Sequence, residues 1–121
     1  MFVFPYVAQP LDVEKMQEAA NYLVGEHDFS SFKSSGTSSK SSVRTIYQAQ
    51  VLREQSRVII MLTGNGFLYN MVRIIAGTLV EIGLGDRKPE EMKEILELKD
   101  RQKAGKTLAA QGLFLMNVEY E

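Results

Sequence analysis

The chain has 121 residues and a mass of 13.6 kDa, which is the size of one domain. Hydrophobic residues make up 45% and charged residues 24%, a balance that excludes a disordered or fibrous protein. The longest apolar stretch, residues 67–84, is interrupted by Asn70, Arg73 and Glu81, so no membrane span is expected. The absence of cysteine excludes disulfide scaffolds, cysteine zinc sites and thiol nucleophiles. No signal peptide is visible, and we expect a cytoplasmic protein.

Charge is distributed unevenly along the chain. The net charge of −1 gives no overall attraction to nucleic acid. Residues 1–27 carry a net charge of −3, whereas residues 28–60 carry five basic and two acidic residues, a net charge of +3. The second segment therefore predicts a local basic surface, or an ordinary solvated hairpin.

The first predicted elements are a strand and a helix. Residues 2–7 are apolar and contain Pro5, which indicates an edge strand or an entering linker. Asp12 is a good N-cap for a helix that Gly25 would end. Apolar residues at helical spacing predict its buried side: Val13, Met16, Ala20, Leu23 and Val24.

A serine-rich segment and a hairpin follow. Residues 30–42 are mostly serine and glycine, so we expect a mobile loop, anchored in the core by Phe29 and Phe32. Residues 43–52 and 57–63 are rich in β-branched and apolar side chains and predict two strands joined by a turn.

Two helices and a strand complete the expected order. Residues 67–82 predict a helix with a buried stripe of Leu68, Val72, Ile75, Leu79 and Ile82. Residues 90–99 predict a short charged helix, and residues 113–120 a last strand. The inward residues of the short helix would be Met92, Ile95, Leu96 and Leu98. The pattern predicts an α+β fold in which helices pack on one face of an antiparallel sheet.

Two short motifs carry little functional information. Gly105-Lys106-Thr107 looks like the end of a phosphate-binding loop, but the required upstream glycine is replaced by Asp100 and no strand precedes it. His27, the only histidine, precedes Asp28, and without a nucleophile this pair more plausibly fixes the turn after the first helix.

The helix from residue 67 carries the most informative residue. At 100° per residue, Arg73 points about 140° away from the apolar stripe. Gly66, Asn70 and Gly77 share its side, and an interior glycine costs about 1 kcal/mol relative to alanine, so a partner is expected to approach there. The alternative is a surface arginine on a half-buried helix.

Five sequence blocks carry a family resemblance. Residues 67–77 read Phe-Leu-Tyr-Asn-Met-Val-Arg-Ile-Ile-Ala-Gly and resemble the helix signature of tRNA pseudouridine synthase A. Four more blocks agree in order: Leu11-Asp12 to the Gly-Glu-His-Asp-Phe-Ser-Ser-Phe of residues 25–32, Val43-Arg44-Thr45-Ile46, Lys99-Asp100-Arg101, and Gly112-Leu113-Phe114-Leu115. One departure is Thr107-Leu108-Ala109-Ala110, where the family commonly has Thr-Ala-Pro-Ala, and losing the proline leaves the approach to Leu113 less rigid.

The resemblance implies one half of a larger enzyme. The resemblance covers only the C-terminal half of such an enzyme, and residues 1–121 would form that half as a single domain. The family's catalytic aspartate lies in an Arg-Thr-Asp-x-Gly-Val-His block of the N-terminal half, and no aspartate here has that context. The family isomerises uridine to pseudouridine at positions 38 to 40 of the tRNA anticodon arm, without cofactor or metal.

The resemblance also implies roles for particular residues. Arg73 would pair with the missing catalytic aspartate, and Leu113 would line the base pocket. The residues expected to meet RNA are Lys33, Lys40, Arg44 and Asn70. Expected partners are tRNA, the chain's own N-terminal domain and a second subunit, with no membrane. The alternative function is a non-catalytic RNA-binding or assembly module of similar fold; a small-molecule-binding domain has little support.

Overall fold

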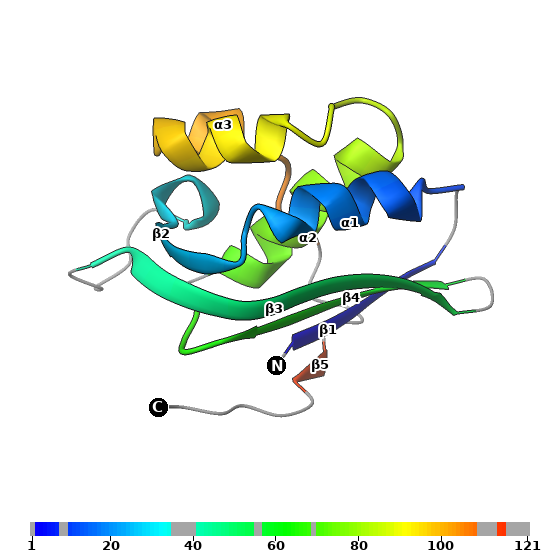
Figure 1. The fold of residues 1–121 in the computed structure, drawn as a ribbon, viewed down its shortest axis with the longest axis horizontal. Helices are drawn as coiled ribbons and strands as arrows, with labels where there is room; N and C mark the ends of the chain where they lie inside the picture. Colours follow the sequence, from blue (N-terminus) through cyan, green and yellow to red (C-terminus); the bar gives the residue numbers. More distant parts are fainter. Residues whose placement is uncertain are drawn as a thin grey trace.

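The computed structural model describes residues 2–7, 10–34, 41–54, 57–68, 70–108 and 114–115, with the backbone alone for 2–7 and 114–115. Five strands form one sheet in the order β2-β3-β4-β1-β5, and every neighbouring pair is antiparallel. Three α-helices lie on one face of this sheet (Figure 1). The predicted α+β architecture is therefore confirmed.

The central hairpin follows from its side-chain pattern. β3 (Val43–Glu54) and β4 (Arg57–Gly64) pair from Glu54↔Arg57 to Ile46↔Gly64, with an irregularity between Ile46 and Gln48. Alternate residues of β4 are buried, as a strand with one covered face requires. Both strands fall where the sequence predicts them.

Two strands differ from prediction. β1 (Phe2–Val7) is not an edge strand, because it lies between β4 and β5 (Phe114–Leu115). The described pairing with β5 ends at Val3, before Pro5, so the missing proline N–H does not interrupt that ladder. β2 (Gly25–Asp28) was not predicted; it pairs with the start of β3. Residues 113 and 116–120 of the predicted last strand lie outside the described residues.

The first helix, α1 (Val13–Asn21), is capped as predicted. The Asp12 carboxylate accepts the backbone N–H of Lys15 at 3.1 Å. Gly25 is not its C-cap, because the helix ends at Asn21 and Gly25, with φ +112°, opens β2. Val24 is 43% exposed rather than inward, since it follows the helix and no longer shares its periodicity.

The central helix, α2 (Met71–Gly83), begins later than predicted. Asn70 adopts a left-handed conformation (φ 60°, ψ 6°), which a right-handed helix cannot continue through. Nearly every residue of α2 is buried, so the alternative of a half-buried helix is wrong. α3 (Glu91–Leu98) lies farther from the sheet, and Leu98 is 57% exposed because it ends that helix (Figure 1).

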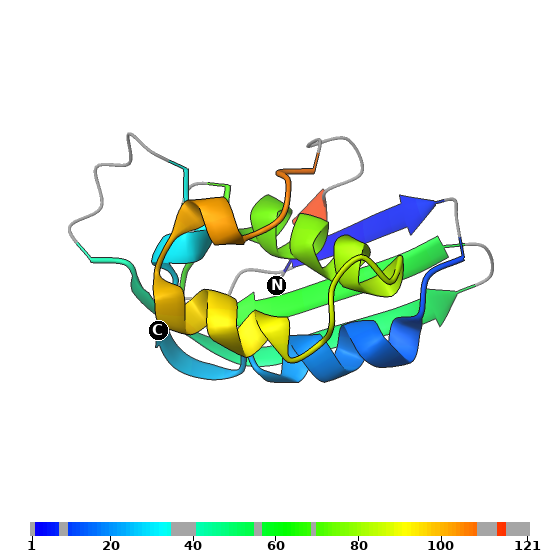
Figure 2. The same cartoon turned by 90° about the horizontal axis from the view of Figure 1, so that it is seen from above.

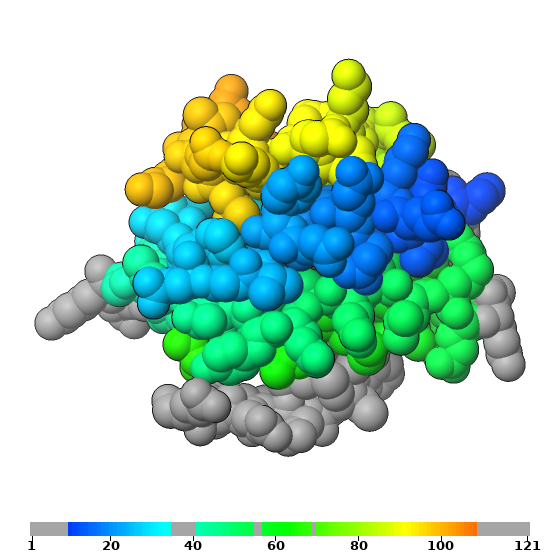
Figure 3. Space-filling model, viewed as in Figure 1, coloured from blue at the N-terminus to red at the C-terminus, as the bar shows by residue number. Residues whose placement is uncertain are grey.

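The serine-rich segment is ordered where it begins. Ser30–Phe32 form a short 3-10 helix, η1, and both Phe29 and Phe32 are fully buried, as expected of core anchors. The buried Ser31 hydroxyl donates to Ile95 O at 2.6 Å and accepts from Asp100 N at 2.8 Å, which joins η1 to α3. The mobile-loop prediction is wrong for residues 30–32, and residues 35–40 lie outside the described part. Figure 3 shows α1 (blue) and α3 (yellow to orange) as one continuous surface above β3 (green).

Candidate active site around Arg73

Arg73 lies in the first turn of α2, and its guanidinium is held by two acceptors of the same chain. Nε donates to the Leu108 carbonyl oxygen at 2.6 Å, and Nη1 donates to Asn70 Oδ1 at 2.8 Å. Asn70 in turn donates through Nδ2 to Ser34 Oγ at 2.9 Å. Arginine donates from five N–H groups in a rigid plane, so two fixed contacts determine where the others point.

The free side of this guanidinium is what matters chemically. Arg73 is half-buried, and no described residue accepts from Nη2. Nη2 carries two N–H donors, and a carboxylate or phosphate oxygen is a suitable acceptor for them because hydrogen bonds between charged groups are strong. The site can therefore bind an anionic group in a fixed orientation.

A backbone segment, rather than an outside partner, fills the space beside Gly77. Residues 104–108, here called the strap, run along α2 (Figure 2, orange). A Cβ on Gly77 would overlap the carbonyl oxygen of Lys106. A Cβ on Gly105 would lie 2.8 Å from Thr78 Cα. Both glycines permit the close approach of two backbones, which explains the interior glycine of α2 and also the glycine of the rejected phosphate-loop motif.

Hydrogen bonds join the strap to α2 at both ends. At one end Gly105 N donates to Thr78 Oγ1 at 2.8 Å, and this buried hydroxyl donates to Ile74 O at 2.9 Å. At the other end Leu108 N donates to Arg73 O at 3.2 Å. Arg73 and Leu108 thus bond to each other twice, once through the backbone and once through the guanidinium.

The predicted RNA-binding residues fall partly in this neighbourhood. Lys33 directly precedes Ser34 and donates through Nζ to Ser42 Oγ at 2.6 Å. Arg44 donates through Nη1 to Ser41 O and Val43 O. Its Nε lies 3.7 Å from the place a Cβ on Gly66 would take, in the segment that leads to Asn70. Lys40 and Leu113 lie outside the described residues.

Sequence reasoning missed two participants. Ser34 and Leu108 contact the site, Ser34 through its hydroxyl and Leu108 through its backbone. A carbonyl oxygen is present in every residue, so no residue type could have marked Leu108. The one usable signal was the pair of small residues, Gly77 and Gly105, which allows the strap to come near.

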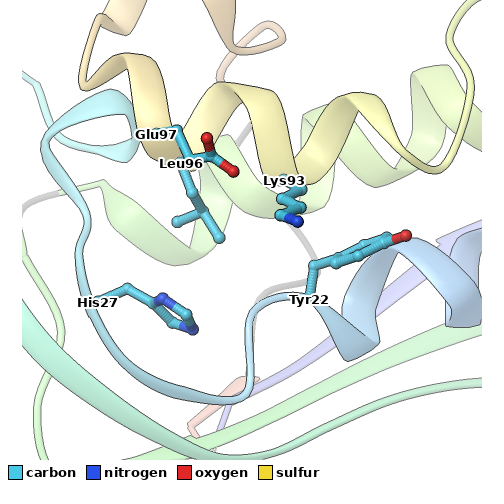
Figure 4. Close-up of a pocket in the computed structure, with 5 residues that line it drawn as sticks. All are labelled: Tyr22, His27, Lys93, Leu96 and Glu97. Atoms are coloured by element: carbon cyan, nitrogen blue, oxygen red, sulfur yellow. The ribbon is translucent and has the colours of Figure 1, made fainter.

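A separate hollow of about 290 Å³ lies between α3 and the end of α1 (Figure 4). Its lining residues are Tyr22, His27, Lys93, Leu96 and Glu97. The His27 Nε2 lies 3.0 Å from Val24 O, which agrees with the predicted role in the turn after α1. Every buried side-chain nitrogen and oxygen in the described part of the chain has a partner, so no unsatisfied group points to a ligand here.

Metal-binding clusters and membrane-spanning helices are both absent from the residues that the structure describes. Among them, no group of three or more metal-binding side chains could hold a metal ion. In the same part of the chain, no helix has the length and apolar character needed to cross a membrane.

The fold and site together define a class: an α+β domain with helices on one sheet face and an arginine prearranged for an anionic group. Comparison with known proteins gives the family. A family profile described as tRNA pseudouridine synthase matches residues 19–121. The chain is similar to proteins named tRNA pseudouridine synthase A from Brevibacillus brevis (56% identical over 115 residues) and Acetivibrio thermocellus (50% identical over 115 residues). It therefore belongs to the tRNA pseudouridine synthase A family.

The matches cover nearly all of this chain but only about half of each relative. These matches cover 95% of this chain but 47% of each relative. A third relative, from Clostridium acetobutylicum, is 49% identical over 98% of this chain and 48% of its own length. The chain thus spans about half the length of the curated relatives it matches, and the resemblance inferred from the five sequence blocks is confirmed.

Proposed function

We propose that this chain is the C-terminal domain of a tRNA pseudouridine synthase, which isomerises uridine to pseudouridine at positions 38 to 40 of the tRNA anticodon arm. Two facts support the assignment. The chain spans about half of its relatives, and it lacks the Arg-Thr-Asp-x-Gly-Val-His block that holds the family's catalytic aspartate. Without that aspartate the domain is inactive alone. Uridine and pseudouridine are isomers, so the reaction needs no oxidant, reductant or group donor.

The observation that carries the proposal is the prearranged guanidinium of Arg73. Nε and Nη1 are bound within the chain, and no described residue takes Nη2. The catalytic aspartate of the N-terminal half accepts from this Nη2. A buried carboxylate without a partner is costly, so the pairing holds it ionised and in place beside the base. The target uridine leaves its stack to reach this site, at a cost of a few kcal/mol, and Leu113 lines the pocket that receives it.

The test is turnover by the full-length enzyme, measured as tritium release from uridine-labelled tRNA. Arg73→Leu should lower turnover by more than about a hundredfold, because breaking a buried ion pair costs about 3–5 kcal/mol. Arg73→Lys keeps the positive charge but not the planar contact, so it should recover part of the turnover that Arg73→Leu loses. Arg57→Leu is the matched control, since Arg57 is exposed and its 3.7 Å ion pair with Glu54 lies on the surface. Near-parental turnover by Arg73→Leu would refute the assignment, and a full-length protein that binds tRNA without turnover would favour the non-catalytic module.

RNA contacts by the basic segment form a second part of the proposal. The anticodon arm contacts four residues: Lys33, Lys40, Arg44 and Asn70. The full-length enzyme is a homodimer, and one tRNA spans both of its subunits. Removing one cation that binds a phosphate should reduce the slope of log affinity against log salt by about 1. Lys33→Ala and Arg44→Ala should each do so in fluorescence anisotropy titrations, whereas Lys93→Ala on α3 should not. Sedimentation of the full-length enzyme tests the dimer.

A further inference from the structure

We propose that Glu81 is a positioning residue for Arg73, acting through the strap; this inference rests on the proposed function of Arg73. Glu81 lies eight residues after Arg73 on α2, about 80° around the helix axis from it and about 12 Å along it. The strap connects them, because Lys106 in its middle bonds to Glu81 and Leu108 at its end bonds to Arg73.

Glu81 holds the strap with both carboxylate oxygens. Oε2 accepts the backbone N–H of Lys106 at 3.0 Å. Oε1 accepts from Arg87 Nε, also at 3.0 Å, and Arg87 Nη1 donates to Lys103 O at 2.7 Å. The side chains of Arg87 and Glu81 are 21% and 25% exposed, so solvent screens this ion pair only partly. Glu81 thus fixes the chain directly before and within the strap.

The strap belongs to no helix or strand, and its described backbone bonds to α2 involve Gly105, Lys106 and Leu108. Outside α2 it is held by the buried Ala104 and by Thr107 Oγ1, which accepts from Arg101 Nη2 at 3.1 Å. An extended segment held at such points moves when one attachment is removed. The carbonyl of Leu108 lies two residues after Lys106, so a shift at Lys106 is passed to the acceptor of Arg73 Nε.

The consequence for catalysis concerns orientation rather than charge. Without the Leu108 carbonyl in place, the guanidinium of Arg73 keeps Asn70 as its acceptor but can rotate about that contact. The free Nη2 edge then no longer points in one direction. Misplacement of a reacting group by about 1 Å can cost a hundredfold in rate, so a partial loss of order should appear in kcat rather than in tRNA binding.

The experiment compares Glu81 variants in the full-length enzyme. Glu81→Leu removes both bonds and should lower kcat about tenfold, with KM for tRNA within about twofold. Glu81→Gln keeps one acceptor of the same reach for Lys106 N–H but turns an NH2 toward Arg87 Nε, so it should restore part of kcat. Glu81→Asp keeps the charge but is one methylene too short, so it should stay low. Glu94→Leu, an exposed glutamate on α3, is the matched control and should leave kcat unchanged.

A double-variant cycle separates this inference from the proposed function. Lysine lacks the Nε–H that bonds to Leu108, so in an Arg73→Lys background Glu81→Leu should lower kcat less than about threefold. An equal loss in both backgrounds, or a kcat for Glu81→Asp at or above that of Glu81→Gln, would overturn the positioning role while Arg73 kept its own. Near-parental turnover by Arg73→Leu would instead overturn the proposed function. If Glu81→Leu fails to fold, the Gln and Asp variants decide the matter alone.

Discussion

The two sides of α2 are covered in different ways. The side opposite Arg73 presents Ile75, Leu79 and Ile82, all fully buried, to the rest of the core. The side of Arg73 is covered by the backbone of the strap, which is held by a hydroxyl, a carboxylate and a guanidinium. Apolar packing depends on volume, whereas the strap depends on a few directional bonds and two glycines. Stability should therefore reside mainly on one side and the geometry of the site on the other.

The largest expected change in stability comes from the apolar side. Leu79→Ala should lower the free energy of unfolding of the full-length enzyme by about 2–5 kcal/mol, because it leaves a cavity in a fully buried position. Arg73 keeps its bonds to Leu108 and Asn70, so kcat at a temperature where the variant is folded should stay within about threefold of the parent. Denaturant unfolding and turnover, measured on the same sample, test the expected loss of stability and the expected retention of kcat. A large loss of kcat would show that the two sides are not independent.

The strap side should respond in the opposite way. Gly77→Ala places a methyl group where the Lys106 carbonyl lies, so the strap must move. Overpacking of this kind costs about 1–3 kcal/mol, less than the Leu79 cavity, but kcat should fall at least about tenfold. Gly85→Ala is the control: a Cβ there meets nothing within 4 Å, so its cost is limited to the strain of its φ of +90°. Unchanged turnover by Gly77→Ala would separate the strap from the site.

Thr78→Val is a gentler test of the same side. Valine has nearly the same shape but removes the acceptor of Gly105 N–H, which is then buried without a partner. Such a loss costs about 1–3 kcal/mol. Thr78→Ser keeps the hydroxyl and should recover most of the stability, as measured by thermal melting. Equal melting temperatures for the valine and serine variants would mean that this bond does not hold the strap.

The smallest expected effect lies away from α2. The Ser30 hydroxyl and backbone N–H, with Lys99 and Lys33 nearby, lower the pKa of the Asp28 carboxyl below its ordinary 3.8, against an opposing effect of burial. A lowered folded-state pKa contributes stability above about pH 4, and this contribution is lost as the pH falls through the folded pKa. Asp28→Asn should thus cost less than about 1 kcal/mol at pH 7, and its difference from the parent should shrink as the pH falls below about 4. A difference that stays constant as the pH is lowered would point to another cause.

The sequence by itself determined those elements whose signals are local. Asp12 caps α1, β3 and β4 follow the period-2 pattern, and Phe29 is buried, each as predicted. The family could also be recognised, because five motifs occur in order along the chain. Arg73 could be singled out because a charged residue interrupts an otherwise apolar helix.

Only the tertiary structure decided what surrounds Arg73. The bonds from the strap to α2 join residues 25 to 35 positions apart, and each uses a backbone atom of the strap. Backbone N–H and C=O groups are the same in nearly every residue, so no pattern in the sequence reports where they will bond. The same reason explains why β2 was missed: its partner strand lies across the serine-rich segment. The sequence marks Arg73, the one charged side chain in the helix signature of residues 67–77, and long-range backbone contacts decide how it is held.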